Sequence, residues 1–186
     1  MKKIIQIVLF LVLILVIALP QAGAEEEEQE LAVDARSAIL MEPTTLEVIY
    51  EKNPDEKLAP ASLTKIMTLI LVYEALEKGL ISKDTVLTAS ESVRGIEGTR
   101  IFLDVGERMK VEDLLKSIAI GSANDAAVVF AEALGGNVAN FAKMMNRKAE
   151  QIGCRNTSFK NPNGLPVEGH YTTARDVALM ASYLVN

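Results

Sequence analysis

The sequence predicts an α/β domain in which one β-hairpin precedes at least four helices. Two short apolar runs, residues 37–41 and 46–50, lie on either side of a polar break, which is typical of a hairpin. Downstream, apolar residues recur at helical spacing in segments that end at glycines. The length fits one domain. Because a two-stranded hairpin is only marginally stable, either the helices carry the fold or further strands complete the sheet.

The hairpin leads through a turn at Asn53-Pro54-Asp55 into the first predicted helix. This helix spans residues 63–78 and stops at Gly79. It carries few charges before Glu74, which indicates a central helix that is buried on most sides.

Four more helices are predicted along the rest of the chain. An amphipathic segment at 111–120 is interrupted at 121–124, and a helix resumes over 125–134. Asn137 is a candidate cap for a helix that runs to about Ile152. Thr173, with Asp176 three residues on, resembles a capping pair that opens the last helix.

The N-terminus has the pattern of a secretory signal peptide over residues 1–24. Lys2 and Lys3 precede an apolar run, and Ala22-Gly23-Ala24 forms a small-x-small cleavage site. An uncleaved membrane anchor is the alternative, but the run is short for a membrane span of about 20 residues. Residues 25–34 are predicted to be an acidic disordered tail. One folded domain is expected over residues 35–186, outside the cytoplasm.

Charge and cysteine content argue against two classes of protein, those that bind nucleic acids and those stabilised by disulfides within the chain. The formal net charge is −6, whereas a nucleic-acid-binding protein presents a basic face. Cys154 is the one cysteine in the sequence, so no disulfide can form within the chain. We interpret Cys154 as a small apolar residue that follows a helix stop.

The first pattern that points to chemistry is Ser62-Leu63-Thr64-Lys65. A serine and a lysine three positions apart lie on the same face of a helix. A neutral lysine can accept the proton of the serine hydroxyl and so turn it into a nucleophile. The pair alone is weak evidence, because both residues are common.

The second pattern is Ser122-Ala123-Asn124, at the predicted break between two helices. The Ser122 hydroxyl could relay a proton, and the Asn124 amide could bind a substrate carbonyl or hold Lys65. Serine and asparagine also favour turns for purely local reasons, so this pattern taken alone favours an ordinary helix-to-helix turn.

Taken together, the two patterns and their surroundings resemble the penicillin-recognising serine enzymes. Within that superfamily the chain resembles the D-alanyl-D-alanine carboxypeptidases of the low-molecular-mass penicillin-binding type. The resemblance covers most of the chain from about Ala35, in the right order, and it rests on the segments 50–53, 59–68, 113–115, 122–126, 161–165 and 170–176.

The resemblance implies a role for each candidate residue. Ser62 is the nucleophile that attacks the bond between two terminal D-alanines of a peptidoglycan stem pentapeptide, and Lys65 is the general base. Ser122 shuttles a proton to the leaving D-alanine, and Asn124 orients the substrate. Penicillins and other β-lactams acylate the same serine, and no cofactor or metal is implied. The Ser62 N–H would supply one oxyanion donor at a helix N-terminus.

One part of the family pattern is absent from these 186 residues. A third motif, Lys-Thr-Gly on a sheet strand, does not occur. We therefore expect a truncated β-lactamase/transpeptidase-like fold, in which helices pack on an antiparallel sheet and only the N-terminal strands and the helical part are present. No membrane anchor of the family's C-terminal type is found, and activity is expected to be impaired.

Several alternatives remain open at this point. A β-lactamase would need an extra glutamate to activate the deacylating water, and Glu168 is the available acid in the 161–170 loop. A non-catalytic exported binding protein of the same fold is a second alternative. A Ser–His–Asp hydrolase that uses His170, or a Cys154–His170 pair, is less favoured, because no local signature surrounds these residues.

Overall fold

A computed structural model describes residues 34–186. The predicted signal peptide and all but the last residue of the predicted acidic tail lie outside the described residues. Among the described residues, no helix is long and apolar enough to cross a membrane. The elements are β1 (Ala38–Met41), β2 (Val48–Lys52), η1 (Ala61–Leu63), α2 (Thr64–Glu77), β3 (Val86–Thr88), η2 (Glu91–Val93), β4 (Arg108–Lys110), α3 (Val111–Gly121), α4 (Asn124–Gly135), α5 (Val138–Ile152) and α6 (Ala174–Val185).

The predicted hairpin is present, and the structure also has a second antiparallel strand pair that was not predicted. Strands β1 and β2 pair antiparallel, with Ala38 opposite Lys52, and the register shifts between Leu40 and Met41. Strands β3 and β4 form a separate antiparallel pair. Each of these two strands is only three residues long, too short for the alternation of side chains to stand out in the sequence.

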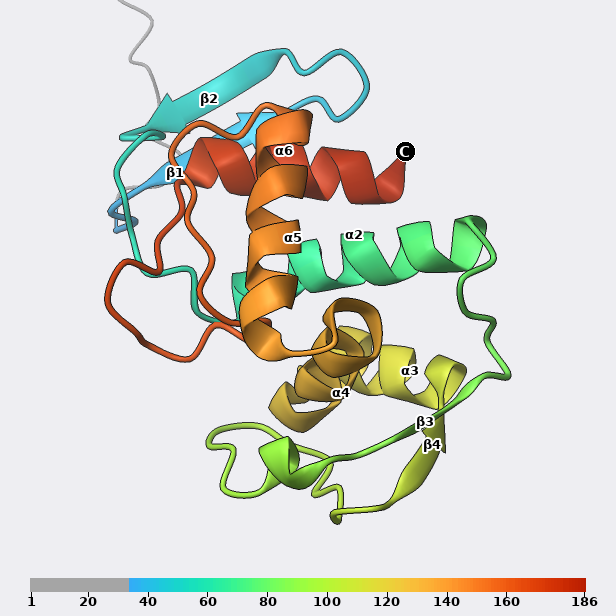
Figure 1. The fold of residues 1–186 in the computed structure, drawn as a ribbon. Coiled ribbons are helices and arrows are strands. Elements are labelled where there is room, and N and C mark those ends of the chain that lie inside the picture. The colour runs from blue at the N-terminus through green and yellow to red at the C-terminus, as the bar shows by residue number, and fades with distance from the viewer. Residues whose placement is uncertain (1–33) are drawn as a thin grey trace, which may run out of the picture. The chain divides into compact units, whose positions relative to one another are not determined.

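Helix α2 is the central helix, as its composition predicts. Figure 1 shows it between α6 on one side and the α3–α4 pair on the other, with α5 crossing beside it. Eight of its 14 residues are buried. Two apolar cores meet at this helix. Val72 belongs to the core with α3 and α4, whereas Met67 and Ile70 belong to the core with α5 and α6.

The predicted helix starts agree with the structure at both capping residues. The Asn137 side chain accepts a hydrogen bond from the backbone N–H of Asn140 at the start of α5. The Thr173 hydroxyl accepts from the N–H of Asp176 at the start of α6. The Asp176 carboxylate turns to the preceding loop, where it accepts from the N–H groups of Arg155 and Asn156.

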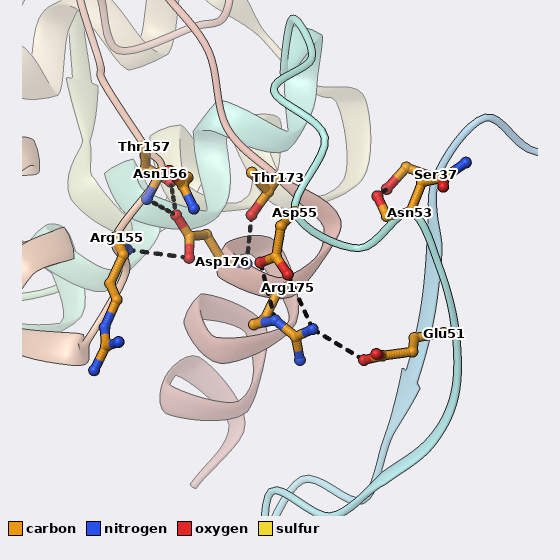
Figure 2. A network of polar contacts seen from close by, with 10 residues as sticks. All are labelled: Ser37, Glu51, Asn53, Asp55, Arg155, Asn156, Thr157, Thr173, Arg175 and Asp176. Atoms are coloured by element: carbon orange, nitrogen blue, oxygen red, sulfur yellow. Dashed lines mark hydrogen bonds and ion pairs between the residues drawn. The ribbon is translucent and has the colours of Figure 1, made fainter.

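An ion-pair cluster ties the hairpin region to the last helix (Figure 2). The Arg175 guanidinium donates to both carboxylate oxygens of Asp55, at 3.0 and 3.1 Å, and to Glu51 at 3.0 Å. Glu51 lies on β2 and Arg175 in the first turn of α6. Backbone hydrogen bonds between Leu58 and Thr172 continue the connection toward Ser62.

Candidate active site

The N-terminal end of α2 presents Ser62 to solvent and keeps Lys65 buried. Ser62 is exposed and lies in the short 3₁₀ turn η1, and Lys65 follows in the first turn of α2. The Lys65 side chain is turned back along the helix, so that its Nζ lies 3.3 Å from the Ser62 Oγ. The predicted spacing therefore produces a direct hydrogen bond between the two groups.

The environment of Lys65 favours the neutral amine. Lys65 is only 4% exposed, and this burial lowers the pKa of its side chain to about 8. At pH 7 roughly a tenth of a group with such a pKa is neutral, against less than a thousandth of a free lysine. Among the described residues, no carboxylate forms an ion pair with Lys65. A substantial fraction of Lys65 is thus present as the neutral amine near neutral pH.

The 159–170 segment covers Lys65 and the turn that bears Ser62. The Lys65 Nζ donates to the backbone carbonyl of Asn163 at 2.9 Å. One turn further along α2, the Thr68 hydroxyl donates to the carbonyl of Pro162 at 2.7 Å. These contacts join residues more than 90 positions apart, and the turn-rich segment Asn161-Pro162-Asn163-Gly164 was the available signal of them in the sequence.

The Ser62 turn itself is shaped by close packing against Gly164. Ala61 has φ +46°, a left-handed conformation that is unusual for a residue other than glycine. A Cβ atom on Gly164 would lie 1.8 Å from the Ala61 carbonyl oxygen. Only a glycine at position 164 therefore allows the loop to approach the turn this closely.

Ser122 and Asn124 lie at the break between α3 and α4, as the sequence predicts. Ser122 is half-buried and has φ +56°. The Asn124 side chain is buried, and its Nδ2 donates to the Glu97 carbonyl at 2.7 Å. Within residues 34–186, no hydrogen bond joins Ser122 or Asn124 to Lys65. The structure thus brings Ser62 and Lys65 into contact and holds the other two predicted residues on a separate loop.

Asp125 was not predicted to contribute to the site, yet it organises the loop beside Asn124. Its carboxylate is 1% exposed and accepts hydrogen bonds from the backbone N–H groups of Ile101 and Leu103. This pairing fixes the 97–103 segment against the start of α4. An acidic residue directly after Asn124 was the available signal, but its two partners lie more than 20 positions upstream.

The geometry disfavours His170 as a catalytic base. The His170 Nε2 lies 3.0 Å from the Thr64 hydroxyl, and its Nδ1 accepts a long hydrogen bond from the Lys160 N–H. Burial, and secondarily the charge of Lys160, lower the pKa of His170. Its contacts place this ring at the side of the Ser62 turn, bonded to Thr64 rather than to Ser62.

Cys154 and Glu168 also lack the surroundings that the alternatives require. Burial and the nearby Asp176 raise the pKa of the Cys154 thiol to about 12, which disfavours the reactive thiolate. Glu168 is exposed, and no hydrogen bond between described residues joins it to Ser62 or Lys65. In the described part of the chain, no group of three or more His, Cys, Asp or Glu side chains is placed to hold a metal ion.

Comparison with known proteins decides the family. Residues 24–186 match the family model for D-alanyl-D-alanine carboxypeptidase, peptidase family S11. The chain belongs to this family. The resemblance drawn from Ser62-Leu63-Thr64-Lys65 and Ser122-Ala123-Asn124 is therefore confirmed, and so is the penicillin-binding protein fold.

Individual members of the D-alanyl-D-alanine carboxypeptidase family are similar over most or all of this chain. The carboxypeptidase DacF of Bacillus subtilis is 47% identical over 188 residues, which are 100% of this chain and 48% of DacF. The crystal structure of the carboxypeptidase DacD from Francisella tularensis has a TM-score of 0.78 and 40% identity, over 80% of this chain and 36% of that one.

A further solved structure that is similar to this chain contains a bound β-lactam. The ampicillin-bound form of penicillin-binding protein D2 from Listeria monocytogenes is 32% identical, with a TM-score of 0.72, over 81% of this chain and 61% of that one. The chain spans less than half of the length of the curated carboxypeptidases that it matches.

Proposed function

We propose that this protein is a serine D-alanyl-D-alanine carboxypeptidase that acts through an acyl-enzyme on Ser62. The observation that carries the proposal is the 3.3 Å contact between the exposed Ser62 hydroxyl and the buried Lys65 amine. A nucleophile within hydrogen-bond reach of a base with a lowered pKa is the arrangement that covalent catalysis requires. Family membership supplies the substrate class, a peptide that ends in two D-alanines.

The contact between Ser62 and Lys65 supports the following first half of the proposed reaction. Neutral Lys65 takes the hydroxyl proton while the Ser62 Oγ forms a bond to the carbonyl carbon of the penultimate D-alanine. The carbonyl becomes an oxyanion beside the Ser62 N–H, which lies in the η1 turn directly before α2, where backbone N–H groups at a helix start are available to an anion. The C–N bond then breaks, and the terminal D-alanine leaves with a proton from Lys65, relayed by Ser122.

The second half of the reaction releases the product. Water attacks the Ser62 ester and transfers its proton toward Lys65, and the shortened peptide leaves as a carboxylate while the Ser62 hydroxyl is restored. Asn124 is proposed to orient the substrate, since it lies at the start of α4 beside Ser122. β-Lactams are proposed to acylate Ser62 in the same way, which is supported by the ampicillin-bound relative.

The test is covalent labelling of the full chain with a fluorescent penicillin, followed by intact mass spectrometry. We expect one adduct, its loss in Ser62→Ala, and a rate at least 100-fold lower in Lys65→Ala. A slow release of the adduct, over minutes or longer, supports a carboxypeptidase, whereas rapid turnover favours a β-lactamase. A folded chain that takes up no label contradicts the proposal and favours the non-catalytic binding alternative.

The proposed substrate, the peptidoglycan stem pentapeptide, requires the protein to work on the outer face of the cytoplasmic membrane or in the cell wall. The signal-peptide pattern of residues 1–24 supports this location. Expression in a bacterial host and mass spectrometry of the exported protein test it. An N-terminus at Glu25 is expected, and a full-length chain retained in the cytoplasm would contradict it.

A further inference from the structure

A lysine that acts as a base must direct its lone pair at the proton it accepts. The neutral amine has two N–H groups and one lone pair, so rotation about its last bond decides which of the three faces Ser62. In the structure, the Lys65 Nζ has two oxygen partners, the Ser62 Oγ and the Asn163 carbonyl. A carbonyl oxygen can only accept. Asn163 therefore takes an N–H of Lys65, and this bond limits the positions that remain for the lone pair.

The orientation of the Asn163 carbonyl is set by the side chain of Asn161. The Asn163 C=O and the Gly164 N–H belong to one planar trans peptide unit, so they point in opposite directions. The Gly164 N–H donates to the Asn161 Oδ1 at 2.7 Å. The same bond that holds the N–H on one side thus directs the C=O to the other side, where the Lys65 Nζ lies 2.9 Å away.

Two more hydrogen bonds fix Asn161 in this role. Its Oδ1 also accepts from the N–H of Asn163 at 3.3 Å, and its Nδ2 donates to the Leu165 carbonyl at 2.8 Å. Both the oxygen and the nitrogen of the Asn161 amide are therefore hydrogen-bonded within one turn of the backbone. Asn163 is only 4% exposed, so water has little access to replace the carbonyl as a partner of Lys65.

We propose that Asn161 is a positioning residue for the acylation step. By binding the Gly164 N–H, it directs the Asn163 carbonyl at Lys65, and that carbonyl holds the amine with its lone pair toward Ser62. This inference rests on the proposed function of Ser62 and Lys65, but it concerns a residue that touches neither of them.

The competing interpretation is that Asn161 merely stabilises a turn, and the chain offers a matched control for it. Asn146 on α5 also makes three hydrogen bonds through its amide. Its Nδ2 donates to the carbonyls of Ala142 and Phe159, and its Oδ1 accepts from the Phe159 N–H. Asn146 thus anchors the start of the same loop, but it does not touch the peptide unit that faces Lys65.

The experiment compares Asn161→Ala with Asn146→Ala in the full chain. Urea unfolding gives the stability of each variant, and the rate of labelling by a fluorescent penicillin is measured from pH 6 to 10. We expect similar losses of stability. Asn161→Ala should label at least tenfold more slowly than Asn146→Ala, also when the rates are compared on the high-pH plateau of each variant, where Lys65 is neutral and only its orientation limits the rate. Equal rates in the two variants would overturn the proposal.

A second readout does not depend on activity. The ¹⁵N shift of the Lys65 Nζ, assigned by its absence in Lys65→Met, gives the pKa of this side chain by NMR. We expect this pKa to rise in Asn161→Ala, because the loop that buries the amine loosens, and to stay at the wild-type value in Asn146→Ala. An unchanged Lys65 pKa in Asn161→Ala would count against the positioning role. This readout works even if the wild-type protein takes up no penicillin. Failure of the wild-type protein to take up penicillin would contradict the proposed function, and it is a separate outcome.

A conservative variant covers the case in which Asn161→Ala does not fold. Asn161→Ser keeps a side-chain oxygen that can accept from the backbone two or three residues on, more weakly than asparagine does, and it lacks the donor to Leu165. We expect Asn161→Ser to label more slowly than the wild type and Asn146→Ala, and faster than Asn161→Ala. If Asn161→Ser is as stable as Asn146→Ala and takes up the label at the same rate as Asn146→Ala, the orientation of the Asn163 carbonyl does not matter for acylation.

Discussion

The two sides of the proposed site are built differently. On one side, Ser62 and Lys65 touch each other, and the 159–170 segment covers them with hydrogen bonds to Lys65 and Thr68. On the other side, Ser122 and Asn124 belong to the α3–α4 break, which is anchored to the 97–103 loop through Asn124 and Asp125. Each side therefore has its own supporting loop.

This difference indicates how the chemistry is divided. The proposed nucleophile and its proposed base, Ser62 and Lys65, are in contact in the structure without a ligand, so the proposed first proton transfer needs little reorganisation. The residues proposed to relay the proton and to orient the substrate make their contacts with the 97–103 loop. We expect changes in one supporting loop to leave the other side intact, and the following four predictions test this independence.

The largest effect is expected for Gly164→Ala. The new methyl group would lie 1.8 Å from the Ala61 carbonyl oxygen, at φ +89°, so the loop must move away from the Ser62 turn. We expect a loss of about 3 kcal/mol or more in the free energy of unfolding and a nearly complete loss of penicillin labelling. Gly106→Ala is the control, because φ is +86° there and the space is open. It should cost only about 1–2 kcal/mol and leave labelling unchanged.

Asp125→Ala should destabilise the side of the proposed site that carries Ser122 and Asn124. It removes the acceptor of two backbone N–H groups, those of Ile101 and Leu103, and the expected cost is about 2–4 kcal/mol. Hydrogen exchange at these two amides should accelerate, while the Lys65 pKa measured by NMR stays unchanged. Asp104→Ala, which removes an exposed carboxylate from the same region, should stay within about 0.5 kcal/mol. A shift of the Lys65 pKa in Asp125→Ala would show that the two sides are coupled.

The third prediction concerns pH. The pKa of Lys65 is lowered to about 8 from an ordinary value of 10.5, so between these values the unfolded chain binds more protons at this site than the folded one. The contribution of Lys65 to the free energy of unfolding therefore rises as the pH increases from about 8 to 10.5. The difference between wild type and Lys65→Met in urea unfolding isolates it. The labelling rate should also rise through pH 8 and then level off. A pH-independent difference in stability would contradict the lowered pKa.

The smallest effect on stability is expected for Ser122→Ala. No hydrogen bond of the Ser122 hydroxyl to another described residue is present, so the free energy of unfolding should change by less than about 0.5 kcal/mol. If Ser122 relays a proton, labelling should slow by about 100-fold. Ser117→Ala is the converse control. It removes a hydrogen bond to the Leu114 carbonyl, which should cost about 1 kcal/mol without any change in labelling.

The features that local chemistry decides could be predicted from the sequence. Helix starts at Asn137 and Thr173 follow from side chains that bond to the backbone three residues on. The contact between Ser62 and Lys65 follows from their spacing on one helical turn. The helix bounds agree with the structure to within one or two residues, because apolar periodicity and terminal glycines mark them.

The support around these features could not be predicted. The carbonyl that binds Lys65 lies 98 residues away in the sequence, and every residue has a backbone carbonyl, so no side-chain pattern reveals it. The left-handed conformation of Ala61 depends on the fold around it rather than on its own preference. The β3–β4 pair was not predicted for a related reason. Its three-residue strands are defined by the backbone hydrogen bonds between them rather than by a side-chain pattern.

The Arg175 cluster has a consequence for the order in which the chain acquires its structure. It joins α6 to Glu51, which precedes it by 124 residues, and the β1–β2 hairpin is only marginally stable without support. A ribosome makes this hairpin first among the described elements, and it makes α6, the helix that β1 packs against, last among them. Because closing such a long loop is slow, we expect the earliest strands to be synthesised well before they become stable.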